Sequence, residues 1–126
     1  KSEFLPYFQP IVDLRNEKVV GFEALARWNS DKRGFVFPND FIPLAEEANL
    51  VTAIDFLIIE KSCLQLKKWE AICGRNDLYV SCNLYGDHFF SATLLTDIQE
   101  ILQRVGLKQS QLRVELTERA LLENSD

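Results

Sequence analysis

Two charged side chains interrupt an otherwise apolar stretch, residues 19–29, and they are the first candidates for chemistry. Glu23 and Arg27 stand among valine, phenylalanine, leucine, alanine and tryptophan residues. Charged groups are rarely buried unless they are paired or bind a ligand. Because side chains alternate along a strand, Glu23 and Arg27 would lie on the same face. The stretch therefore predicts a strand that presents a carboxylate and a guanidinium together, and we expect Glu23 at a strand end.

Two further predicted strands end in side chains that offer oxygen. Asn83 ends the apolar run 78–84, and Glu115 and Glu118 lie at the end of 112–117. The carboxyl ends of parallel strands form the site in α/β folds, and such oxygens are the ligands that Mg²⁺, Mn²⁺ or Ca²⁺ require. A guanidinium beside them suits a phosphate. Together these residues predict metal-assisted phosphoester chemistry.

Each of these groups also has a structural explanation when it is taken alone. Glu23 and Arg27 could form an ion pair, and Asn83 could satisfy loop backbone groups. Glu115 and Glu118 could be a solvated strand end and a helix-capping acid. The functional interpretation rests on their joint placement, because three successive strands would each have to acquire an oxygen ligand by accident.

The order of the predicted elements indicates an α/β fold. Strands are expected over 4–14, 19–28, 78–84 and 112–117, helices over 39–47, 51–73 and 94–105, and the start of a helix at 119–122, with a loop over 30–38. The first two strands are expected to form a hairpin, and the later alternation predicts a parallel sheet. This order fits an open sheet or the first part of a (β/α)8 barrel, which needs roughly 250 residues.

The helix predicted over 51–73 rests on one apolar stripe. Its members recur at steps of three and four residues, which places them on one face: Phe56, Ile59, Cys63, Leu66, Trp69 and Cys73. Glycines that follow the two longer helices, Gly74 and Gly106, are expected to end them. The stripe predicts that this helix packs on the sheet.

Composition limits the class of protein. The 126 residues suit one domain, and 47% hydrophobic residues exclude a disordered chain. Fourteen basic and 19 acidic residues give a net charge of −5, which argues against a nucleic-acid polymer as partner. Three cysteines without a CxxC pair are expected to be reduced and mostly buried. No apolar run approaches the roughly 18 residues of a membrane span and no signal peptide opens the chain, so we expect a cytoplasmic domain, with tethering of the parent left open.

Five motifs, in order and in spacing, resemble the EAL domain of bacterial cyclic di-GMP phosphodiesterases. They are YFQPIV (7–12), GFEALARW (21–28), PNDFIPLAEE (38–47), VSCNL (80–84) and VELTE (114–118). The resemblance covers essentially the whole chain. It implies that residues 1–126 form a partial EAL domain, the N-terminal half of a modified (β/α)8 TIM-type barrel, with a mostly parallel sheet and an early antiparallel strand pair.

The resemblance also implies a role for each matching residue. Glu23, Asn83 and Glu115 would bind metal, Gln9, Leu25 and Arg27 would contact the dinucleotide, and Glu118 would stabilise a loop that shapes the metal site. The implied reaction opens one phosphodiester of cyclic di-GMP to give linear pGpG, with two Mg²⁺ or Mn²⁺ ions activating a water. Further family ligands, on later strands, are not in this chain, so we expect the parent to be the enzyme and the chain alone to be inactive.

Two other functions remain open at this stage. A degenerate EAL domain would bind cyclic di-GMP, or a protein partner, without hydrolysis. A plain α/β fragment would use its acids structurally. The partners to consider are cyclic di-GMP, a second copy in a homodimer, and GGDEF or sensor domains of the parent.

Overall fold

The computed structural model describes residues 3–86 and 92–117. Along the chain the elements are β1 (Phe4–Asp13), β2 (Lys18–Ser30), β3 (Gly34–Val36), α1 (Pro38–Glu47), α2 (Val51–Cys73), β4 (Tyr79–Leu84), α3 (Leu94–Val105), the short 3-10 helix η2 (Gln109–Gln111) and β5 (Leu112–Leu116). Both longer helices have the predicted bounds, and the helix start expected at 119–122 lies outside the described residues.

All five described strands belong to one sheet, in the order β1-β2-β4-β5, with β3 attached to β2. β1 and β2 are antiparallel, whereas β2, β4 and β5 run parallel to one another. The predicted hairpin and the parallel strands that follow it are both confirmed. Pro6 and Pro10 lie on β1, which pairs only with β2 among the described strands. Such a strand tolerates proline, because proline cannot donate to a central ladder.

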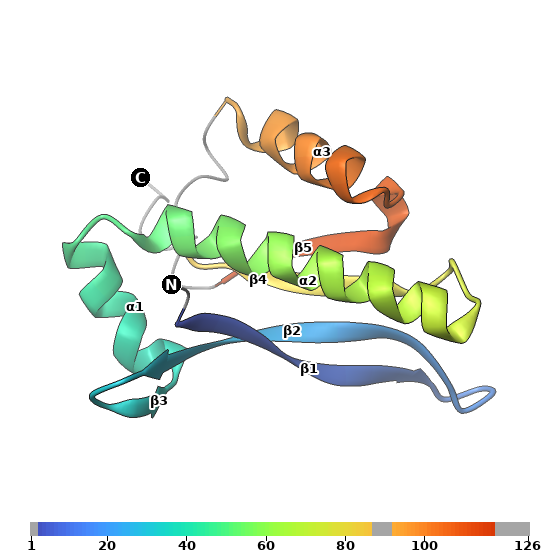
Figure 1. Ribbon diagram of the computed structural model, residues 1–126, viewed down its shortest axis with the longest axis horizontal. Coiled ribbons are helices and arrows are strands. Elements are labelled where there is room, and N and C mark those ends of the chain that lie inside the picture. Colours follow the sequence, from blue (N-terminus) through green and yellow to red (C-terminus); the bar gives the residue numbers. More distant parts are fainter. Residues whose placement is uncertain (1–2, 87–91, 118–126) are drawn as a thin grey trace.

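Helices α2 and α3 pack on one face of this sheet (Figure 1). Their core with β4 contains Ile59 and Cys63 of α2 together with Ile101 and Leu102 of α3. A second apolar cluster joins α1 and the first turns of α2 to the far part of β2. The helices therefore leave the opposite face of the sheet uncovered by any described helix.

The expectation of a loop over 30–38 is wrong in part, because Gly34–Val36 forms β3. Gly34 has φ +71°, a left-handed conformation that glycine adopts without strain, and it lets the chain fold back. Phe35 then pairs with Asn29, and Val36 with Trp28. The polar residues before Gly34 are typical of a loop, so the sequence pattern did not predict this strand.

The apolar stripe of α2 packs on the sheet as predicted, with Phe56 and Trp69 partly buried, except at its end. Ile59, Cys63 and Leu66 are almost fully buried, but Cys73 is exposed. Trp69, one turn before Cys73, packs on Phe8 of β1 and Phe22 of β2. The last three residues of α2, 71–73, are all exposed. In the described part of the chain, no helix has both the length and the hydropathy to cross a membrane.

Candidate active site on the open face of the sheet

Side chains of β2 divide between the two faces of the sheet. Ala24 and Ala26 are buried in the two apolar clusters beneath the helices. Because side chains alternate along a strand, Glu23, Leu25 and Arg27 lie on the opposite face, which we call the open face. The register of β2 with β1 is continuous from Phe22 to Trp28, so Glu23 and Arg27 share one face, as predicted.

The strand register brings the predicted site residues together on this open face. Gln9 lies opposite Glu23 across the hairpin, and Glu23 lies opposite Ser81 of β4. The next residue of β4 on this face is Asn83, which lies opposite Glu115 of β5. From ordinary strand spacing, the Cα atoms of Glu23 and Glu115 are roughly 12 Å apart. Four of the predicted residues thus occupy neighbouring positions of one surface.

The expectation that Glu23 ends its strand is wrong. β2 continues to Ser30, seven residues beyond Glu23. What ends near Glu23 is the parallel pairing with β4, whose last pair is Ala24 with Cys82. Beyond that point β2 pairs with β3 instead. Glu23 therefore lies at the rim of the parallel sheet even though its own strand is longer.

Arg27 is oriented by the backbone and by an aromatic ring. Its Nη1 donates a hydrogen bond of 2.8 Å to the carbonyl of Ala26, and the guanidinium carbon lies 4.7 Å from the centre of the Phe37 ring. Within residues 3–86 and 92–117 no carboxylate forms an ion pair with it. The alternative of a Glu23–Arg27 ion pair is therefore not observed in this part of the chain, and the guanidinium keeps donors for an anion.

Two residues that the sequence did not point to, Asp55 and Tyr85, hold the end of β4. The Asp55 carboxylate accepts backbone hydrogen bonds from Tyr85 at 3.0 Å and Gly86 at 2.9 Å. Burial raises the pKa of the Tyr85 phenol, and hydrogen bonding with the Asn83 side chain acts in the opposite direction. Asp55 is one of three acids in helix 51–73, with Glu60 and Glu70, so the residue type alone did not distinguish it.

The open face offers oxygen donors but only part of a metal site. Among the described residues no group of three or more His, Cys, Asp and Glu side chains could hold an ion. Glu23 and Glu115 provide carboxylates and Asn83 an amide, and these donors are of the kind that Mg²⁺ or Mn²⁺ binds. The residues fit such an ion in chemistry but are too few to enclose it. Glu118 lies outside the described residues.

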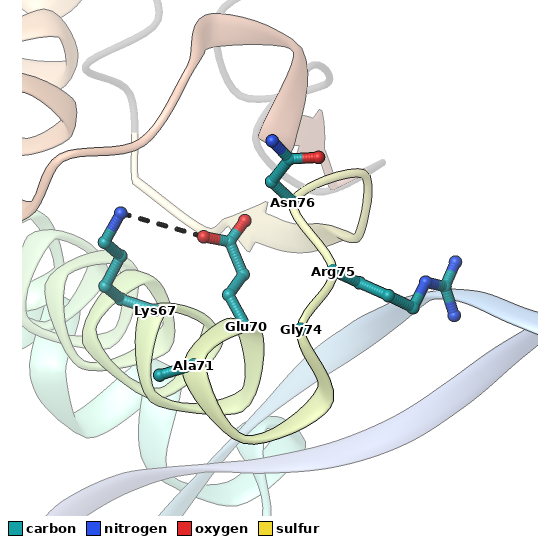
Figure 2. A pocket seen from close by; sticks show the side chains of 6 residues that line it. All are labelled: Lys67, Glu70, Ala71, Gly74, Arg75 and Asn76. Atoms are coloured by element: carbon teal, nitrogen blue, oxygen red, sulfur yellow. Dashed lines mark ion pairs between the residues drawn. The ribbon is translucent and has the colours of Figure 1, made fainter.

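A separate pocket of about 370 Å³ lies at the other end of α2 (Figure 2). It is lined by Lys67, Glu70, Ala71, Gly74, Arg75 and Asn76. Lys67 lies 3.7 Å from the Glu70 carboxylate and donates to the Gly106 carbonyl. Glu70 accepts a hydrogen bond from the buried Gln111. These hydrogen bonds connect the C-terminal part of α2 to the residues that precede β5. They indicate that the polar groups of this pocket have a structural role.

Arg75 does not add a free charge to this pocket. Its side chain points away from Lys67 and Glu70 (Figure 2). It forms an ion pair with Asp77 at 2.9 Å and donates to the Val19 carbonyl. The polar groups of the open face are therefore the better candidates for binding a ligand.

Comparison with known proteins agrees with this geometry. A family model described as the EAL domain matches residues 1–126. The chain belongs to the EAL domain family. Its sequence is 35% identical over 125 residues to the cyclic di-GMP phosphodiesterase PdeR of Escherichia coli K12, covering 99% of this chain and 18% of PdeR. It is 30% identical over 126 residues to the bifunctional diguanylate cyclase/cyclic di-GMP phosphodiesterase MucR of Pseudomonas aeruginosa PAO1, covering 100% of this chain and 18% of MucR.

Solved EAL structures have the same fold. The chain matches the PaMucR phosphodiesterase in complex with cyclic di-GMP with a TM-score of 0.83 and 31% identity, over 98% of this chain and 50% of that one. It matches the EAL enzyme Bd1971 bound to cAMP and cyclic di-GMP with a TM-score of 0.80 and 28% identity, over 98% of this chain and 35% of that one. This EAL chain is thus a partial barrel, and it spans less than a fifth of PdeR or MucR.

Proposed function

We propose that this EAL chain is part of a metal-dependent phosphodiesterase that hydrolyses cyclic di-GMP to linear pGpG. The observation that carries the proposal is the common face of Glu23, Asn83 and Glu115, with Arg27 further along the same face of β2. Relatives named as cyclic di-GMP phosphodiesterases support the choice of substrate.

Glu23, Asn83 and Glu115 would hold one side of an Mg²⁺ or Mn²⁺ centre. When bound, such ions activate a water and neutralise charge on a phosphate. These three side chains can provide only a few of the about six ligands that the ion takes, so the remaining positions would be filled by water, by a substrate phosphate or by residues in other parts of the full-length protein. The position of Asn83 depends on the Asp55 contacts that hold the residues after it.

Arg27 would bind a phosphate of the dinucleotide. Its backbone hydrogen bond and its contact with Phe37 fix the guanidinium before the ligand arrives, which lowers the entropy lost on binding. Gln9 and Leu25, on the same face, would line the dinucleotide groove. Glu118 would stabilise the loop that follows β5.

The test is hydrolysis of cyclic di-GMP by the full-length protein with Mg²⁺ or Mn²⁺, with pGpG measured by chromatography. Losing a partner outside the metal shell commonly costs about 10- to 100-fold, so Glu23→Gln, which alters a ligand itself, should lower the rate by about 100-fold or more. Glu17→Gln, in the exposed turn between β1 and β2, is the matched control and should leave the rate unchanged. Failure of the wild-type protein to form pGpG would contradict the proposal.

Binding of cyclic di-GMP without hydrolysis is the second candidate. It is favoured by one observation: a group suited to a phosphate is present in the described part of this chain, whereas the metal donors there are few. The same experiment separates the two functions. Saturable binding by the full-length protein without pGpG would establish the receptor.

A further inference from the structure

Three exposed aromatic side chains gather on the open face beside Arg27. Tyr7, Phe35 and Phe37 are 44%, 53% and 56% exposed, and we call them the aromatic patch. The ring centres of Tyr7 and Phe35 lie 5.4 Å apart, with the rings at 79°. Phe37 contacts the Arg27 guanidinium. The patch therefore combines ring surface with a positive charge.

The strand pairing explains how residues so far apart in sequence meet here. Tyr7 lies opposite Leu25 on one edge of β2, and Phe35 lies opposite Asn29 on the other edge. Leu25, Arg27 and Asn29 alternate along the same face. The Tyr7 and Phe35 rings therefore approach each other across β2, and Arg27 lies between the two pairings.

Leaving these rings in water has a cost. Burying a phenylalanine side chain is worth roughly 1.5–3 kcal/mol, and each of these rings is about half exposed in this partial barrel. A ligand with a flat aromatic ring would recover it, because nucleic-acid bases stack on exposed aromatic side chains and on arginine. A phosphate attached to that base would meet the guanidinium that has no ion-pair partner among the described residues.

A protein partner fits this patch less well. A stable protein interface buries about 800 Å² on each side, which is far more than three side chains provide. The chain carries a net charge of −5, so two copies repel each other, whereas a small anion meets mainly the local charge of the arginine. A purine base joined to a phosphate matches both the size and the charge.

We propose that the aromatic patch stacks one purine base of the cyclic dinucleotide whose phosphate Arg27 binds. Phe35 and Tyr7 provide the ring surface, and Phe37 acts as a positioning residue for the guanidinium. The inference rests on the proposed function and adds the residues that bind the base.

The test is the Kd of cyclic di-GMP for the full-length protein, measured by calorimetry without divalent metal so that no turnover occurs. Base stacking is worth enough that Phe35→Leu should weaken binding about 5- to 100-fold. Phe35→Tyr keeps an aromatic ring and should bind within about two-fold of wild type. Ile72→Ala removes another exposed apolar side chain, on α2, and should have no effect.

Ribose 5-phosphate, which has a phosphate but no base, serves as the second probe. It should compete equally well for wild type and for Phe35→Leu. Tyr7→Leu repeats the measurement from β1 in case the β3 variant folds poorly. If wild type and both leucine variants bind cyclic di-GMP with equal affinity, this inference alone is overturned. It is also overturned if Phe35→Leu loses as much affinity for ribose 5-phosphate as it loses for cyclic di-GMP. Absence of cyclic di-GMP binding by the wild type would overturn the proposed function as well.

Discussion

The Asp55 carboxylate of α2 accepts a hydrogen bond of 2.9 Å from the backbone N–H of Gly86, beyond the end of β4. Asp55 is only 2% exposed, and it also accepts from the N–H of Tyr85. The helical layer thereby fixes the residues that follow Asn83. The position of this candidate metal ligand depends on a helix as well as on the sheet.

Replacing Asp55 by Asn should therefore affect both stability and activity. The amide oxygen can replace Oδ2, which accepts the bonds from Tyr85 and Gly86, but the amide NH2 then takes the place of Oδ1 and faces the Tyr85 N–H. Two donors that face each other in a buried site cost about 1–3 kcal/mol in the free energy of unfolding. Urea denaturation measures this loss, and cyclic di-GMP hydrolysis should fall with it. Asp31→Asn, in an exposed turn, should change stability by less than about 0.5 kcal/mol. Equal stability of the two variants would contradict the role of Asp55.

Gly21 should not tolerate a side chain. A Cβ at this position would lie 2.7 Å from the Tyr79 carbonyl oxygen and 2.9 Å from the Tyr79 ring. We expect Gly21→Ala to lower the free energy of unfolding by about 1–3 kcal/mol, as other overpacked sites do. Adding Tyr79→Ala should restore only part of the loss, because the backbone carbonyl remains. Full restoration, or an unchanged melting temperature for Gly21→Ala, would show that the strands separate easily here.

The three cysteines should differ in reactivity. Burial raises the pKa of the Cys63 and Cys82 thiols to about 12, whereas Cys73 is exposed. Because the thiolate is the nucleophile, iodoacetamide at a pH of about 8 should modify Cys73 and leave the two buried thiols until the protein is denatured. Peptide mapping by mass spectrometry measures this. Labelling of Cys82 in the native protein would indicate that the core opens.

The same two thiols should make stability depend on alkaline pH. Their folded pKa lies above the ordinary value of 9.0, so the unfolded chain loses these protons first as pH rises. The two protonated thiols contribute fully to the free energy of unfolding below a pH of 9.0, and this contribution declines as the pH rises toward about 12. Cys82→Ala should therefore show a shallower fall in unfolding free energy than wild type over this range. An equal slope would argue that the thiol is accessible to water.

Ser62 offers a stabilising substitution. Its hydroxyl is buried without a nitrogen or oxygen partner in the described part of the chain, and it faces the Cys82 thiol, a weak partner. Ser62→Ala should keep or raise the free energy of unfolding by up to about 1 kcal/mol. Ser30→Ala is the matched control, because the Ser30 hydroxyl accepts backbone hydrogen bonds from Lys32 and Arg33 and its loss should destabilise. A marked loss in Ser62→Ala would reveal a stronger partner.

The helices were the most predictable part of this fold. Apolar spacing and the glycines at 74 and 106, both in the left-handed conformation, defined the extent of α2 and the end of α3 because these signals are local. β3 was missed because a strand of three residues is too short to show an alternating pattern. It exists because of its pairing with β2, which is a tertiary contact. Cys73 was expected in the core because its spacing continues the apolar stripe, but the last three residues of α2 are all exposed, and spacing alone does not say where the packing of a helix ends.

The candidate site was predictable in composition and less so in geometry. Alternation placed Glu23 and Arg27 on one face, and the register then brought Asn83 and Glu115 beside them. The distance of Glu23 from the end of β2 could not be predicted, because it depends on which neighbour each part of β2 has. The support from Asp55 depends on packing between a helix and a loop that are 30 residues apart.

β3 pairs only with the outer part of β2, beyond the last pair that joins β2 to β4. Substitutions at Phe35 therefore leave the hydrogen bonds of the parallel sheet intact. The residues proposed to bind the base can therefore be changed separately from the candidate metal donors, which lie on β2, β4 and β5 where these strands pair in parallel. A change of β3 alone would alter the ligand contacts without removing a pairing of the parallel sheet.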